Sequence, residues 1–167
     1  RLYFEQADID ALEEKYATRL DDLLLSKESM EAATEIYVQY QTRVAERAAV
    51  VKGLLDDHEF SFTKDEFIER DRENAKWPAD AAEAKNLWRL QLKEALLGET
   101  LRRQEIARRA KEQGKENPLK DQPLAKEKIS QRYDRFFKTI KATDEEDIAN
   151  YFLSAVARAH DPHSEYF

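Results

Sequence analysis

The chain has 167 residues, a formal net charge of -7 at pH 7, 3 glycines and no cysteine. A chain of this length can bury roughly 70% of its unfolded surface, which is enough for one domain with a real core. The acidic charge argues against a nucleic-acid partner, because such proteins bind phosphates with clustered lysine and arginine, and the lack of cysteine excludes disulfides, thiolate zinc sites and cysteine nucleophiles.

The composition predicts an all-α fold of five to six amphipathic helices in an irregular bundle, with no significant sheet. Charged residues make up 38% of the chain and hydrophobic residues 41%, a balance typical of solvent-exposed helices, and glycine is too scarce for many tight hairpins. The apolar runs are only a few residues long, so neither a membrane span nor a signal peptide is expected. Because the first residue is Arg1 rather than methionine, we expect the natural start to lie upstream.

Two helices are predicted in the first third of the chain. Asp8 is a good N-cap for the first, whose apolar residues recur at steps of three and four as far as Leu23. Ser26 or Ser29 can cap the second, which should run to about Asp57 and measure roughly 45 Å at 1.5 Å per residue. The expected buried stripe of this second helix comprises Ala33, Ile36, Tyr37, Tyr40, Val44, Ala48, Val51 and Leu55.

The middle of the chain predicts a short helix followed by a long one. Thr63 and Glu66 have the spacing of a capping box, which indicates a short third helix ending before the "WP" dipeptide. Asp80 with Glu83 has the same spacing and predicts the start of a helix that reaches about Gln113. The expected buried face of this helix consists of Leu87, Trp88, Leu92, Leu96 and Leu101.

The segment "GKENPLKDQP", residues 114–123, is the one linker-like stretch, and we expect it to be a mobile loop. A further helix should follow it, and Thr143 with Glu146 repeats the capping-box spacing ahead of a last helix. The apolar residues of these two helices are Ile129, Tyr133, Phe136, Phe137 and Ile140 in the first, and Ile148, Tyr151, Phe152, Ala155, Val156 and Ala159 in the second.

Charge is unevenly distributed along the sequence. Residues 1–60 hold 7 Lys/Arg against 14 Asp/Glu, whereas residues 99–141 hold 13 against 7. Such an asymmetry can steer an acidic partner or draw two lobes together. The interleaved signs of "LRRQEIARRAKEQGK" favour the simpler interpretation of a solvated helix face.

The three histidines, His58, His160 and His163, raise the question of a metal site with Asp161 as a further ligand. Pro162 lies between the last two and breaks the helix that would align them, which argues against a metal. We favour an Asx-turn at Asp161 that ends a helix and redirects the chain. The prediction is therefore a structural turn, with no metal and no cofactor, at Asp161, Pro162, His163 and Ser164.

No catalytic residue is expected in this chain. Ser164, His163 and Asp161 are residue types of a hydrolytic triad, but a triad is normally assembled from separate segments. Gly53, Gly98 and Gly114 are isolated, so no glycine-rich turn can form an oxyanion hole. A second open question is whether certain aromatic residues form a partner groove or, as we favour, seal helix junctions in the core. They are Tyr3, Phe4, Phe60, Phe62, Trp77 and Trp88.

Five stretches occur in a distinctive order along the chain. They are "YF" followed by "DID" (residues 3–10), "FSFTKDE" with Arg72 and "WP" (60–78), "LWRLQLKEALL" (87–97), "QRYDRF" (131–136) and "NYFLSAVARAHDPHSEYF" (150–167). This set resembles the N-terminal region of the tail-specific, or carboxy-terminal processing, serine proteases of the Prc or Tsp type. Ser164 stands where that family more often has threonine.

The resemblance implies a non-catalytic helical domain, residues 1–167, ahead of a PDZ-like module and a protease core with a Ser-Lys dyad. Both of these parts are absent from the chain, so no residue inherits a catalytic role. The implied enzyme degrades or trims proteins recognised by an apolar C-terminus in the periplasm of Gram-negative bacteria. The domain would shape substrate access, form a homo-oligomer or dock an adaptor protein, and the turn at residues 161–164 would lead toward the missing parts.

An alternative from another class stays open at this point. A stand-alone helical adaptor or scaffold would bind a protein partner through an amphipathic groove. A nucleic-acid binder that uses the basic residues 102–141 ranks last, because the chain as a whole is acidic.

Overall fold

The computed structural model describes residues 1–19 and 28–161, and this part of the chain is all-α. It contains five helices and no strand: α1 (Gln6–Tyr16), α3 (Glu28–Asp57), α4 (Ala81–Glu112), α5 (Ala125–Lys141) and α6 (Glu145–His160). The predicted fold class is confirmed. No described helix combines the length and the apolar character that crossing a bilayer requires.

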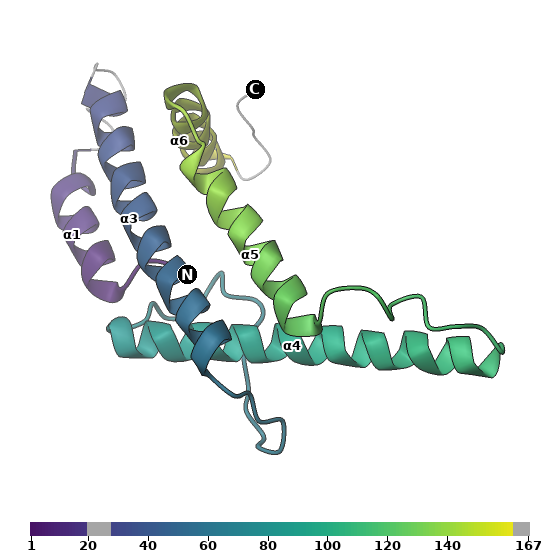
Figure 1. The fold of residues 1–167 in the computed structure, drawn as a ribbon. Coiled ribbons are helices and arrows are strands. Elements are labelled where there is room, and N and C mark those ends of the chain that lie inside the picture. The colour runs from purple at the N-terminus through teal and green to yellow at the C-terminus, as the bar shows by residue number, and fades with distance from the viewer. Residues whose placement is uncertain (20–27, 162–167) are drawn as a thin grey trace.

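The two longest helices, α3 and α4, cross one another, and the other helices are arranged around this crossing (Figure 1). Helix α5 contacts both α3 and α4, and α6 folds back to contact α3. Helix α1 lies along the outer side of α3 (Figure 1). The result is an open, irregular bundle in which α4 forms a base and the other helices stand on one side of it.

The main core lies where α3, α4 and α5 meet. Leu92 is fully buried at its centre and Trp88 is 2% exposed. The Trp88 indole N–H donates to the carbonyl of Leu2 at 3.0 Å, so its polar edge is satisfied inside the core. The buried members of this cluster are Val44, Val51, Leu54, Leu55, Trp88, Leu92, Leu96, Ile129, Phe137 and Ile140.

Helix α4 begins where the sequence predicts. The Asp80 carboxylate accepts the backbone N–H of Glu83 at 2.8 Å, as an N-cap should. The helix ends in a Schellman motif, in which the N–H groups of Gly114 and Lys115 donate back to the carbonyls of Lys111 and Ala110. Gly114 adopts φ +66°, a left-handed conformation that glycine tolerates without strain.

The predicted third helix is wrong, because residues 58–80 form an irregular connection. Thr63 does not cap a helix: its hydroxyl pairs with that of Ser61 at 2.8 Å. The Glu66 carboxylate reaches across to Arg89 and Lys93 of α4, each at 2.5 Å. The capping box therefore does not form, because the Glu66 carboxylate binds two charged side chains on another helix instead.

Three predicted helix starts also need correction. The N-cap of α1 is Glu5 rather than Asp8, which sits three residues later and accepts the Glu5 backbone N–H. Ser29 lies inside α3, and Ser26, like Leu20 and Leu23, falls outside the described residues. Helix α6 is capped by Asp144 with Asp147 instead of Thr143 with Glu146, since a carboxylate is the stronger cap.

One residue of the expected buried face of α4 is exposed. Leu101 is 54% exposed, whereas Leu92 on the same helix has no exposed surface.

We predict that Leu92→Ala lowers the free energy of unfolding by about 2–5 kcal/mol, because the truncation leaves a cavity in a packed core. Leu101→Ala should change it by less than about 0.5 kcal/mol. Urea unfolding followed by tryptophan fluorescence measures both, and equal losses would contradict the assignment of the two faces.

Candidate functional site

An apolar groove lies between α3, α5 and α6 and is the candidate functional site. It encloses about 630 Å³ and is open to solvent along one side. The N-terminal half of α3 forms one wall, the end of α5 the floor, and α6 the second wall. Its lining residues are Phe4, Ala33, Ile36, Tyr37, Tyr40, Thr139, Ile140, Thr143, Ile148, Tyr151, Phe152, Ala155, Val156 and Ala159.

Tyr37 links the two walls of the groove. Its hydroxyl donates to the backbone carbonyl of Ile140 on α5 at 3.2 Å. Its ring stacks on that of Tyr151 on α6, with ring centroids 6.4 Å apart, and also contacts Tyr40. Tyr151 is 60% exposed at the groove edge, which places a large apolar ring where an incoming chain would meet it.

The end of the groove is closed by the N-terminal segment, residues 1–5, through Phe4. The Phe4 ring packs against Tyr40 of α3 and against Trp77, with centroid distances of 6.0 and 6.4 Å. Tyr3 packs edge-on against Tyr40 and Trp88. Tyr3, Phe4, Trp77 and Trp88 thus seal helix junctions, as we favoured, whereas Phe62 is 46% exposed and does not. Phe4 and Tyr40 line the groove as well.

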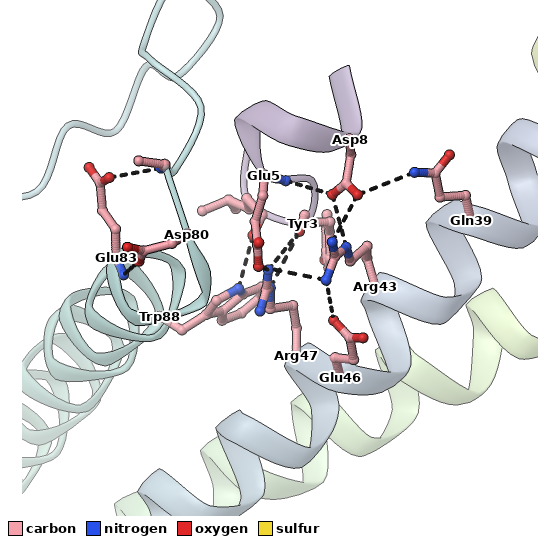
Figure 2. Close-up of polar contacts among 12 residues, drawn as sticks. Tyr3, Glu5, Asp8, Gln39, Arg43, Glu46, Arg47, Asp80, Glu83 and Trp88 are labelled. Atoms are coloured by element: carbon pink, nitrogen blue, oxygen red, sulfur yellow. Dashed lines mark hydrogen bonds and ion pairs between the residues drawn. The ribbon is translucent and has the colours of Figure 1, made fainter. Parts of the chain in front are cut away.

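Two ion pairs hold the N-terminal segment and the start of α1 on α3 (Figure 2). Arg47, 2% exposed, donates to the Glu5 carboxylate at 2.6 Å and to the carbonyl of Tyr3 at 3.2 Å. Arg43 binds both carboxylate oxygens of Asp8, each at 2.8 Å. Because Phe4 lies between these contacts, the pairs fix the position of the groove's end.

The charged groups of this cluster shift one another's pKa values. Burial by itself would raise the pKa of Asp8, but hydrogen bonds from Arg43, the Glu5 backbone N–H and Gln39 hold it below the ordinary aspartate range. The hydrogen bond to Asp8 in turn raises the pKa of Arg43. Both groups are therefore charged at neutral pH, and the pair is intact there.

The groove offers no group for covalent chemistry among the described residues. Its polar side chains are tyrosine and threonine hydroxyls, and burial raises the pKa of Tyr40. Among residues 1–19 and 28–161, no group of three or more His, Cys, Asp or Glu is placed to hold a metal ion. The lining is suited to contact with an apolar chain.

The predicted turn is only partly within the described residues. Helix α6 ends at His160, and the backbone of Asp161 becomes extended while its N–H donates to the carbonyl of Ala157 at 2.9 Å. Pro162, His163 and Ser164 lie outside the described residues, so the turn itself stays a prediction. His58 packs edge-on against Phe60 at the end of α3.

Sequence reasoning missed the residues that organise the site. Arg47 and Arg43 are spaced four apart on α3, and Glu5 and Asp8 three apart near the N-terminus. Two cations and two carboxylates at such similar spacings indicate that the two segments can form two salt bridges with each other. The groove residues Tyr37, Phe152 and Val156 were identified as apolar stripes, but which stripes stay uncovered depends on how far apart the helices lie.

Comparison with known proteins gives one family and one relative. The family described as "Tail specific protease N-terminal domain" matches residues 1–167. The protein named "Tail-specific protease" of Haemophilus influenzae is 32% identical over 165 residues. The match covers 98% of this chain but 21% of that relative, so the chain spans about a fifth of its length.

The Arg47–Glu5 pair gives a stability prediction. Arg47→Met should cost about 3 kcal/mol or more, because it leaves the buried Glu5 carboxylate with a weaker partner. The double variant Glu5→Gln/Arg47→Met should recover part of this loss, since it leaves no unpaired charge. Arg135→Met, at an exposed position of α5, is the control and should cost less than about 0.5 kcal/mol. Chemical denaturation gives all three values; a loss for Arg47→Met no larger than that of the control would count against the pair.

The Asp8–Arg43 pair gives a pH prediction. Because the folded pKa of Asp8 lies below its ordinary value, the unfolded chain takes up the proton first as the pH falls. The contribution of Asp8 is thus fully present above the ordinary aspartate pKa of about 4 and is lost below it. Asp8→Asn should destabilise the chain at pH 7, and the difference from the parent chain should shrink between about pH 5 and pH 2. The exposed Asp10→Asn is the control; a constant Asp8 difference across this range would refute the coupling.

Proposed function

Since the chain belongs to the family of tail-specific protease N-terminal domains, we propose that it is the non-catalytic helical domain of a carboxy-terminal processing serine protease. The enzyme would degrade or trim proteins recognised by an apolar C-terminus, with its Ser-Lys dyad in a part outside these 167 residues. The location that goes with this role is the periplasm. Within this enzyme the domain shapes substrate access.

The observation that carries the proposal is the open groove between α3, α5 and α6, which is almost wholly apolar and has no reactive group among its described lining residues. Ala155, on its α6 wall, is solvent-exposed. A surface groove of this volume and character normally binds something, because leaving it open to water is unfavourable. An apolar stretch of an unfolded substrate matches it in chemistry.

The dimensions of the groove favour a short extended peptide. Its lining runs along α6 from Ile148 to Ala159, which corresponds to about 16 Å at 1.5 Å per residue. An extended chain rises about 3.3 Å per residue, so the groove accommodates about five residues. The hydroxyls of Tyr37, Thr139 and Thr143 are available along it for a peptide's backbone groups.

An adaptor protein and a second copy of the domain are the competing occupants of the same groove. An adaptor helix would lay an apolar face between the two walls, whereas a second copy would bury the groove against itself. Both would occupy the groove in the absence of substrate. The substrate role therefore requires that the groove be empty in the domain alone and accept a single peptide.

We predict that a fluorescent ten-residue peptide ending in four apolar residues binds the chain and remains intact. Ala155→Asp should weaken its binding at least about tenfold, equivalent to 1.4 kcal/mol, because a carboxylate in the groove must be desolvated. Fluorescence anisotropy measures affinity, and mass spectrometry of the peptide detects cleavage.

Ala11→Asp is the matched control, since Ala11 is also an exposed alanine within a helix, α1, but lies away from the groove. Its effect should stay within about twofold. Equal affinity of the two variants would rule out the groove as the binding site, and cleavage of the peptide would refute the non-catalytic role. A self-associated chain that Ala155→Asp dissociates would assign the groove to a second copy instead.

A further inference from the structure

Helix α4 is apolar on two opposite sides, and the fold covers only one of them. The buried side carries Trp88, Leu92 and Leu96. Leu101 follows Leu92 by nine residues, which at 100° per residue places it about 180° away around the helix axis. Leu97 and Leu101 are 38% and 54% exposed on that opposite side. A helix that is apolar on opposite sides is normally enclosed by protein on both.

The arrangement of the helices explains why this side is open. In Figure 1, α1, α5 and α6 lie above α4, α3 crosses in front of it, and a loop of the connection between α3 and α4 extends below it. That connection contributes Phe67, which is 90% exposed. No helix covers this side among the described residues. We call it the outer α4 face and define it as Phe67, Leu97, Gly98 and Leu101.

Ion pairs fix the chain on both sides of Phe67. Glu66 binds Arg89 and Lys93 of α4, each at 2.5 Å, and their hydrogen bonds, that of Arg89 first, hold the pKa of Glu66 at about 2. Three residues beyond Phe67, Arg70 pairs with Glu94 of α4. The exposed ring is therefore carried by a segment clamped along α4 by salt bridges, which limits the entropy lost when a partner covers it.

Charged side chains of both signs border this face: Arg70, Arg102 and Arg132 with Glu94 and Glu99. Leu97, Gly98 and Leu101 line a shallow hollow of about 510 Å³ that Arg70, Arg102 and Arg132 border. Arg70 and Arg102 pair with Glu94 and Glu99, while the Arg132 guanidinium lies over the ring of Tyr133, 5.4 Å from its centroid. Glu99 also pairs with Lys128 of α5 at 3.3 Å. A complementary surface would be apolar at its centre, with a carboxylate opposite Arg132.

We propose that the outer α4 face is the surface on which the remainder of the tail-specific protease, in the same polypeptide, docks against this domain. The relative named above has about four fifths of its length outside the match, which covers 21% of it. A covalently linked domain needs little contact area, because its effective concentration reaches the millimolar range. This inference rests on family membership and not on the substrate role of the groove, so either can fail alone.

The size of the face argues against a second copy as the occupant. The exposed parts of Phe67, Leu97 and Leu101 amount to fewer than two complete side chains, or roughly 350 Å² at about 200 Å² for a large side chain. A stable complex between separate molecules buries about 800 Å² on each partner. A little over half of such an area, about 450 Å², is apolar. The face thus offers less apolar surface than two free chains normally bury, and enough to orient a tethered domain.

The test uses single cysteines, which the chain allows because it has none of its own. Leu101→Cys is placed both in the 167-residue chain and in the full-length protease, and the rate of its reaction with a maleimide is followed by mass spectrometry of the peptide that contains it. We expect the rate in the full-length protease to be at least tenfold lower than in the 167-residue chain.

Val38→Cys on α3 is the matched control, since Val38 is 53% exposed against 54% for Leu101. Its rate should be the same in both proteins. Equal rates for Leu101→Cys would show that the face stays open in the whole enzyme, and equal slowing at both positions would show that this face is not the specific one; either overturns the proposal. So would a rate in the 167-residue chain that falls with its concentration, because a second copy would then cover the face.

Discussion

The fold depends on one buried charge, the guanidinium of Arg47. An arginine with 2% of its surface exposed is stable only if its hydrogen bonds are met inside the protein, and here the N-terminal segment supplies the partners, the Glu5 carboxylate and the Tyr3 carbonyl. Because these partners belong to residues 1–5, the hydrogen bonds of Arg47 also hold that segment across α3 and against α4. Phe4 then closes the end of the groove, and the Leu2 carbonyl receives the Trp88 indole N–H.

The same bundle leaves two apolar surfaces, and their shapes suit different tasks. The groove between α3, α5 and α6 is concave, and Tyr37 holds its walls together with a hydrogen bond and a stacked ring. A flexible chain can enter such a groove. The outer α4 face is shallow, carries Phe67 between two ion-paired residues, and is bordered by charged side chains of both signs. Those properties match a folded surface that arrives in one orientation.

Local sequence signals predicted where helices exist better than where they begin. Asp80 with Glu83 marked the start of α4 correctly, because its partners lie within one turn and no distant group competes for them. Thr63 with Glu66 has the same spacing, yet Glu66 binds two cations on α4 and no helix forms. At α6 the adjacent Asp144 replaced Thr143 as the cap. For the candidate site, the apolar stripes of α3 and α6 were predicted, whereas the ion pairs that position Phe4 were not.

The sequence by itself determined the all-α class, the helical faces, the loop at residues 114–123 and the family, because each of these is written in periodicity, caps and short motifs that act over a few residues. Tertiary structure alone decided which apolar residues are covered. Leu92 and Leu101 are the same residue type on the same helix, and only the position of α3 and α5 buries one and exposes the other. Contacts between residues more than 20 positions apart decide which residues are buried, which partners Glu66 binds and that Arg47 pairs with Glu5. A local pattern cannot choose among such partners.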